Sequence, residues 1–160
     1  MILVTVGMQL GFDRLIRAMD ALAPELGMKV VAQTGRGEYR PANMEAHQAL
    51  APTRFEELAS RARVLVSHAG IGTVLTAQRL GKPIVLMPRR ADLGEHRNDH
   101  QVATVCQLAG RDGILVALGE TELGVRIGEA LGSKPAPDQP SPKQAQLEAA
   151  IRHFITAGSL

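Results

Sequence analysis

Short apolar runs alternate with segments of helical periodicity along most of this 160-residue chain. The runs are typical of strands buried in a parallel sheet and fall at 2–6, 28–32, 46–50, 64–67, 83–87 and 114–117. Apolar residues at helical spacing lie at 12–26, 53–62, 73–80, 98–108 and 120–131. Strands that alternate with helices over short links form a parallel sheet with helices on both faces. The pattern therefore predicts a Rossmann-like α/β domain over residues 1–131.

Local signals predict where two of these helices begin. Thr53 is followed three residues later by Glu56, the spacing of a capping box, so we expect Thr53 to cap the helix at 53–62. Asn98 is a residue type that caps helices, and its amide equally suits a ligand hydroxyl, so both interpretations stay open.

The chain changes character after residue 131. Four prolines within 132–142 are typical of a semi-stiff linker. Residues 143–160 then show a helical pattern with one apolar face. This C-terminal helix either packs back on its own sheet or is offered to a partner protein.

Composition narrows the function classes. Hydrophobic residues make up 45% and charged residues 21% of the chain, as in soluble globular proteins. Only three Phe, one Tyr and no Trp are present, and the net charge is +2 without a dense basic tract, which argues against nucleic-acid binding. Neither a signal peptide nor an apolar run of about 18 residues is evident, so we expect a cytoplasmic protein.

Potential metal ligands are sparse. The single cysteine, Cys106, excludes an internal disulfide, and we expect it to be a small buried hydrophobe in its helix. His96 and His100 stand four residues apart and would share a helix face, but no third ligand is evident. We therefore expect no metal and no bound cofactor.

The turn Ser67–Thr73 is the most informative candidate site. It contains Gly70 and Gly72, follows a predicted strand and opens a predicted helix, an arrangement that favours a phosphate at the helix N-terminus. A second glycine turn, Gly7–Gly11, follows the first strand, and carboxyl ends of parallel strands share one edge of a sheet. The dinucleotide fingerprint, the Walker motif and the Gly-x-Ser-x-Gly nucleophile turn are absent.

A polar run, Gly94–Gln101, follows the next strand along the chain. Glu95, Asn98 and Gln101 are suited to bind the hydroxyl groups of a sugar or a ribose. Three arginines precede or join this run, and they form either a solvated loop or a contact with an anion: Arg89, Arg90 and Arg97.

Taken together, these motifs resemble a known family. Thr5-Val6-Gly7, Gln33-x-Gly35, Ser67-His68-Ala69-Gly70-x-Gly72-Thr73, Pro88-Arg89 and Glu95-His96-x-Asn98-x-His100-Gln101 occur in the order found in the donor-binding half of GT-B glycosyltransferases of family 28. The chain is most similar to the soluble subunit of two-part enzymes, which include bacterial exopolysaccharide glucuronosyltransferases and a eukaryotic N-acetylglucosaminyltransferase. The resemblance covers residues 1–131.

The resemblance implies the fold and the chemistry. The chain would be one half of a GT-B fold that binds a UDP-sugar, and a membrane-associated partner subunit would bind a lipid-linked or polysaccharide acceptor. Such a partner would hold the chain peripherally at the inner face of the membrane. The implied donor-binding residues are Gly7, Met8, Gln33, Ser67, His68, Ala69, Gly70, Gly72, Thr73, Arg89, Asn98 and Gln101.

Sugar transfer also needs a general base for the acceptor hydroxyl. Glu95 and His96 are the local candidates for it, although the partner half often supplies this group in such folds. The function expected is therefore that of a donor-binding subunit of an inverting glycosyltransferase, in exopolysaccharide synthesis. The alternatives are a non-catalytic nucleotide-sugar-binding regulatory module and a sugar-nucleotide epimerase, and the short chain argues against the epimerase.

Overall fold

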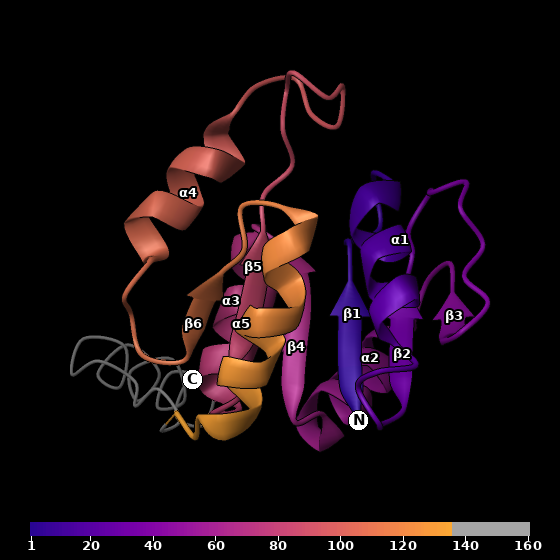
Figure 1. Cartoon of the computed structure of the whole chain (residues 1–160), viewed down its shortest axis with the longest axis vertical. Helices are drawn as coiled ribbons and strands as arrows, with labels where there is room; N and C mark the ends of the chain where they lie inside the picture. Colours follow the sequence, from indigo (N-terminus) through magenta and orange to yellow (C-terminus); the bar gives the residue numbers. More distant parts are fainter. Residues whose placement is uncertain (136–160) are drawn as a thin grey trace, which may run out of the picture.

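A six-stranded parallel sheet forms the centre of the computed structural model, which describes residues 1–135 (Figure 1). Its strands are β1 (Ile2–Thr5), β2 (Val30–Gln33), β3 (Glu45–His47), β4 (Val64–His68), β5 (Ile84–Met87) and β6 (Ile114–Val116). They lie in the order β3-β2-β1-β4-β5-β6, so the strand order reverses between β1 and β4. Ligands bind open α/β sheets at such a reversal, beyond the carboxyl ends of the strands.

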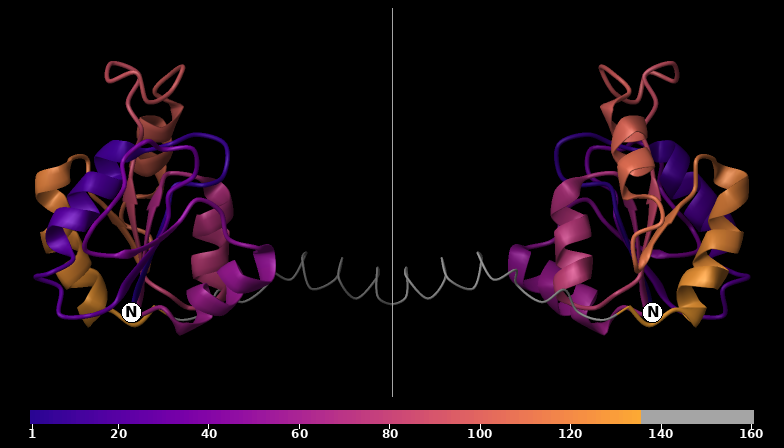
Figure 2. Two further views of the ribbon diagram at one scale, coloured as in Figure 1. Left: turned by 90° about the vertical axis from the view of Figure 1, so that its right-hand side faces the viewer. Right: turned by 90° about the vertical axis from the view of Figure 1, so that its left-hand side faces the viewer.

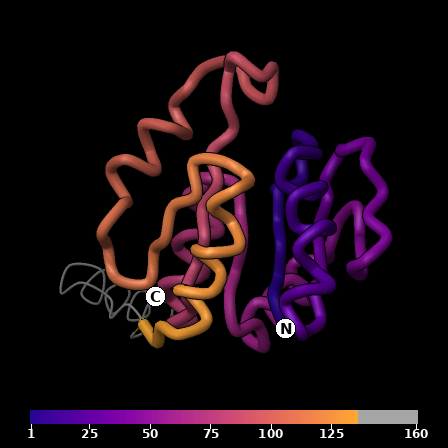
Figure 3. Tube along the Cα trace, viewed as in Figure 1, coloured from indigo at the N-terminus to yellow at the C-terminus, as the bar shows by residue number. Residues whose placement is uncertain are grey.

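Helices cover both faces of the sheet. The helices are α1 (Asp13–Leu22), α2 (Pro52–Arg61), α3 (Ile71–Arg79), α4 (His100–Leu108) and α5 (Glu120–Gly132). Figure 2 shows α1 and α5 on one face of the sheet and α2 and α3 on the other. The chain trace in Figure 3 shows that α4 is reached by a long excursion of the chain after β5. This arrangement confirms the predicted Rossmann-like α/β fold.

The alternation of side chains along each strand explains the two layers. In β1, Ile2 and Val4 pack with α1 and α5, whereas Leu3 packs with α2, α3 and α4. All four residues of β1 and of β5 are buried, because a strand in the middle of a covered sheet meets apolar side chains on both faces. The continuous apolar runs in the sequence are the direct consequence.

Three predictions about helix starts are wrong, and one of them concerns α3, which begins at Ile71 instead of residue 73. The helix α2 begins at Pro52, with Ala51 as its N-cap and no side-chain cap, so Thr53 lies inside the first turn instead of capping it. Proline suits the first helical position because its missing N–H group would lack a partner there in any case. The helix α4 begins at His100 and not at Asn98, and its N-cap is Asp99.

Three further predictions are corrected. Cys106 is exposed, because the buried side of α4 is formed by Gln101, Val105 and Leu108, and position 106 lies off that face. The helix α1 ends at Leu22 instead of residue 26, since residues 23–26 form a turn before β2, and β3 covers 45–47 instead of 46–50.

The C-terminal part of the chain is described only in part. The helix α5 ends at Gly132, and residues 136–160 lie outside the described residues. The predicted linker at 132–142 falls largely among those residues and the helix at 143–160 entirely, so both stay predictions, as does the domain boundary at 131. In the part described, no helix is long and apolar enough to cross a membrane.

Candidate functional site

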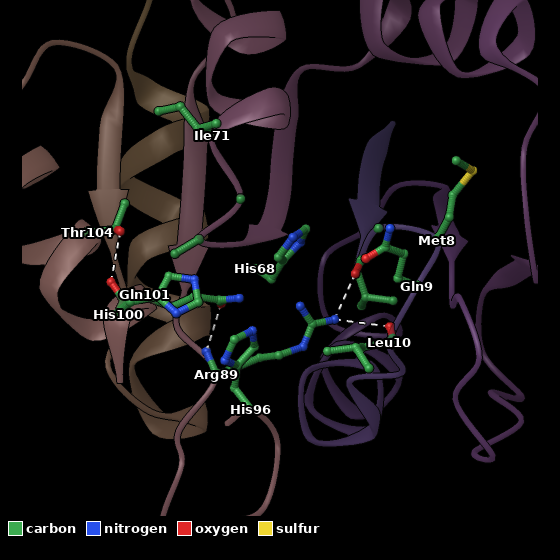
Figure 4. A pocket seen from close by; sticks show the side chains of 14 residues that line it. Met8, Gln9, Leu10, His68, Ile71, Arg89, His96, His100, Gln101 and Thr104 are labelled. Atoms are coloured by element: carbon green, nitrogen blue, oxygen red, sulfur yellow. Dashed lines mark hydrogen bonds between the residues drawn. The ribbon is translucent and has the colours of Figure 1, made fainter. Parts of the chain in front are cut away.

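A cavity of about 590 Å³ opens at the carboxyl edge of the sheet, where the strand order reverses. Three segments surround it: the loop after β1, the junction of β4 with α3, and the chain from the end of β5 into α4 (Figure 4). Its lining residues are Val6, Gly7, Met8, Gln9, Leu10, His68, Ala69, Gly70, Ile71, Arg89, His96, His100, Gln101 and Thr104. Among the described residues, this lining includes an arginine and three histidines but no carboxylate.

The loop after β1 turns sharply at Gly7. Its φ angle of +77° lies in the left-handed region, which favours glycine. A side chain here would also crowd the neighbouring strand end, because a Cβ atom would lie 3.2 Å from Cε1 of His68. Glycine therefore lets the backbone of this loop approach the imidazole of His68 across the reversal point.

The imidazole of His68, at the end of β4, lies between Gly7 and Gly70. An added Cβ at Gly70 would lie 2.8 Å from its Cε1 and closer still to Nε2. Ser67 Oγ is 3.3 Å from Nδ1 on the other side of the ring. Burial and then the positive charge of Arg89 lower the pKa of His68 to about 4. The ring is therefore neutral at pH 7, with one N–H to donate.

The helix α3 begins at the same cavity. Gly70 is the N-cap, with no side-chain cap, and both Gly70 and Ile71 line the cavity. The first N–H groups of a helix have no partner within the helix and lie at the positive end of its dipole. This helix start is consequently suited to an anion.

Arg89 holds the loop after β1 in place. Its side chain is buried, and its Nη2 donates to the carbonyl oxygens of Val6 at 2.8 Å, Leu10 at 3.1 Å and Gly11 at 3.4 Å. Its own backbone N–H donates to Oε1 of Gln101 at 3.1 Å. Burial lowers the pKa of Arg89, yet a guanidinium stays charged at pH 7. Arg89 therefore binds the loop after β1 at its start, Val6, and at its end, Leu10 and Gly11. It also adds a buried positive charge beside the cavity.

The chain between β5 and α4 brings histidines to the opposite wall. The rings of His96 and His100 lie edge to face with centroids 4.4 Å apart, and Asn98 Oδ1 contacts Nδ1 of His100. Within residues 1–135, Nδ1 of His96 is buried and has no hydrogen-bond partner. No three His, Cys, Asp or Glu side chains of these residues gather closely enough to hold a metal ion.

The structure brings most of the predicted residues together and leaves the others outside the lining. Those that line the cavity are Gly7, Met8, His68, Ala69, Gly70, Arg89, His96 and Gln101. Those that do not are Gln33, Ser67, Gly72, Thr73, Glu95 and Asn98. Gln33 and Ser67 are buried within their strands, Gly72 and Thr73 lie in the first turn of α3, and Glu95 turns away to pair with Arg14.

Sequence reasoning did not select Gln9, Leu10, Ile71 and Thr104 for the site. Thr104 carried a usable signal, because it follows His100 by one helical turn on the same face. Gln9 and Leu10 belong to the glycine turn that was recognised, but nothing in a loop sequence says which side chains face inward. The interaction of Arg14 with Glu95, across 81 residues of sequence, had no local signal at all.

Comparison with solved structures shows the same fold in glycosyltransferases. A solution structure of ALG13 matches with a TM-score of 0.58 at 16% identity, over 91% of this chain and 93% of that chain. The glycotransferase of kitacinnamycin matches with a TM-score of 0.57 at 22% identity, over 98% of this chain. The calicheamicin glycosyltransferase CalG4 matches with a TM-score of 0.55 at 22% identity, also over 98%.

The chain spans 39% and 38% of the length of the kitacinnamycin and calicheamicin enzymes, respectively. No curated protein sequence matches it significantly. The family model described as the glycosyltransferase family 28 C-terminal domain matches residues 1–151, which confirms the resemblance seen in the motifs. The chain therefore belongs to the glycosyltransferase family 28 C-terminal domain family.

Proposed function

We propose that this chain binds a UDP-sugar donor for an inverting glycosyltransferase and that a partner subunit supplies the acceptor-binding half. One observation carries the proposal. The cavity at the strand-order reversal combines the Gly7 turn, the start of α3 and the buried charge of Arg89, and no carboxylate of residues 1–135 lines it. Backbone amides, a helix N-terminus and a nearby cation are the elements that bind a diphosphate.

The same elements suit the departure of UDP. When the bond from the sugar to the diphosphate breaks, negative charge builds on the phosphate oxygens. Fixed N–H groups at the start of α3 can donate hydrogen bonds to that charge, and the imidazole of His68 lies beside them at the edge of the cavity. A volume of about 590 Å³ falls within the usual range for a small-molecule site.

The opposite wall would hold the sugar. His100, Gln101 and Thr104 follow one face of α4 into the cavity and present groups that hydrogen-bond to hydroxyls. Of the two candidate bases, His96 lines the cavity, whereas Glu95 is bound by Arg14 and does not line it. His96 is therefore the residue of this chain that is placed to accept the acceptor proton, unless the partner supplies the base.

An exposed apolar surface supports a partner. Apolar side chains at the cavity and on α3 are exposed: Met8 by 65%, Leu10 by 47%, Ile71 by 57% and Leu75 by 57%. From the family resemblance, we propose that this partner is membrane-associated, that the acceptor is a lipid-linked or polysaccharide chain, and that the product is an exopolysaccharide.

The second candidate is a nucleotide-sugar-binding regulatory module without catalysis. The engagement of Glu95 by Arg14 favours it, because this leaves the cavity without a carboxylate base. Both functions predict donor binding, and they differ in transfer. With a partner subunit present, the His96→Ala variant should lose transfer if this chain supplies the base.

Calorimetric titration tests the proposal directly. We expect the full chain to bind UDP, and UDP-glucuronate or UDP-N-acetylglucosamine at least as well, with uridine as the matched control that lacks phosphates. Binding of uridine as tight as UDP would contradict the diphosphate site, and no binding of any UDP compound would refute the donor function. Transfer to a soluble acceptor by this chain alone would refute the need for a partner.

A further inference from the structure

The segment 88–99 forms part of the cavity wall, so its position must be fixed by contacts with the rest of the protein. It joins β5 to α4, carries His96, and has no helix or strand of its own. Its internal hydrogen bonds are local, such as Glu95 N to Arg90 O and Gly94 N to Ala91 O. Local turns shape a segment, but they do not fix where it lies against the rest of the molecule.

Arg89 connects the start of this segment to the loop after β1, and Arg14 of α1 makes a second long-range connection, which reaches Glu95. The Nε of Arg14 donates to Oε1 of Glu95 at 2.7 Å and its Nη2 to Oε2 at 2.8 Å, a bidentate pair. The same Nη2 donates to the carbonyl oxygen of Pro88 at 3.1 Å, and Oε2 of Glu95 also accepts from the backbone N–H of Arg90 at 3.0 Å. Arg14 thus binds the segment at its first residue, Pro88, and at Glu95, the residue before His96.

Burial distinguishes this pair from the other ion pairs of the described residues. Both side chains are only 13% exposed, whereas the partners in the remaining pairs are mostly more than a third exposed. The guanidinium groups of Arg14 and Arg89 also lie 5.2 and 5.1 Å from the centre of the Phe12 ring. Phe12 directly precedes α1, so the ion pair connects the segment to the base of the loop that Arg89 holds.

We propose that Arg14 and Glu95 form a positioning pair, which fixes the segment 88–99 against α1 and so places His96 and the start of α4 at the cavity. In this role Glu95 is not the general base, because both of its oxygens are occupied by Arg14 and the Arg90 amide. The proposal deepens the proposed function, on which its effect on donor binding rests.

The first test compares UDP binding in Arg14→Gln, Glu95→Gln and the double variant. We expect each single change to weaken UDP binding about tenfold, since misplaced binding groups cost affinity. The double variant should bind like a single one, because either change already breaks the pair. Arg14→Lys should bind with intermediate affinity. The double variant also guards against misfolding, since it removes both buried charges and separates only the exposed Glu120 from its contact with Arg14 at 3.4 Å. Melting curves should show that all variants are folded at the assay temperature.

The matched control is the exposed pair Arg126–Glu129 on α5, changed in the same way. It should leave UDP binding unchanged. Wild-type affinity in both single variants would overturn the positioning role, as would additive losses in the double variant. Unchanged UDP binding with loss of transfer in Glu95→Gln alone would instead make Glu95 the base.

A second readout needs no ligand and separates this proposal from the donor function. The side-chain NMR signals of His96 should shift in both single variants, while those of His47 on β3 should not. If wild type fails to bind UDP but the His96 signals shift as expected, the donor function fails and the positioning pair stands. Unmoved His96 signals would overturn the positioning pair, whatever UDP does.

Discussion

Replacing Arg89 with methionine would test whether a single buried guanidinium holds the loop after β1. The side chain of Arg89 is 3% exposed, and its Nη2 is the shared donor for the carbonyl oxygens of Val6, Leu10 and Gly11. Methionine reaches as far as Nε of arginine and fills the space of the arginine stem, but it offers no donor and lacks the guanidinium head. The variant therefore removes the hydrogen bonds and the charge while it keeps the packing of the stem.

The expected cost follows from these contacts. The bonds to Val6 and Leu10, at 2.8 and 3.1 Å, are good charge-assisted bonds, each worth about 1.5–3 kcal/mol, while the bond to Gly11 at 3.4 Å adds little. The variant no longer has to bury a charged guanidinium, and this offsets part of the lost hydrogen-bond energy. We expect a net loss of about 3 kcal/mol in the free energy of unfolding, or a fall in Tm of roughly 6–12 °C.

Urea unfolding at pH 7 measures this change, with Arg126→Met as the matched control. Arg126 is 41% exposed and pairs with Glu129 on the surface of α5, so its loss should cost less than about 1 kcal/mol. A loss at Arg89 no larger than that at Arg126 would show that the hydrogen bonds to the loop do not stabilise the fold.

The remaining predictions concern His68 and its neighbours. Gly70→Ala should weaken UDP binding in calorimetry about tenfold, because the new Cβ would displace the His68 ring. Gly72→Ala is the control and should not weaken it, since nothing lies within 4 Å of a Cβ at this position. Equal UDP affinities of the two variants would contradict this prediction. The pKa of His68 falls from its usual 6.5 to about 4 in the folded protein, mainly through burial. In that window the unfolded chain binds a proton that the folded chain does not, so the free energy of unfolding should decrease as the pH is lowered from 6.5 to 4. His68→Gln should flatten this dependence in urea titrations, and an unchanged slope would rule out His68 as its source.

The sequence predicted the sheet correctly because buried parallel strands are marked by local composition. Runs such as Ile2–Val4 and Val64–Val66 are apolar throughout, since both faces of the sheet are covered. Helix starts were less predictable: Pro52 and Thr53 both suit a first turn, and the tertiary structure favoured the earlier start. The burial of Cys106 was predicted incorrectly because the orientation of α4 about its axis depends on what the helix packs against.

The sequence by itself determined the alternation of strands and helices, the two glycine turns and the family to which the motifs belong, because these depend on residues close together in the chain. Only the tertiary structure decided which side chains meet. Arg89 was predicted as a donor contact, and the fold also commits it to the carbonyl groups of Val6, Leu10 and Gly11. Glu95 was a candidate base, and the fold pairs it with Arg14, 81 residues away. Such partners are set by how the helices and strands pack, and a linear sequence carries no local mark of them.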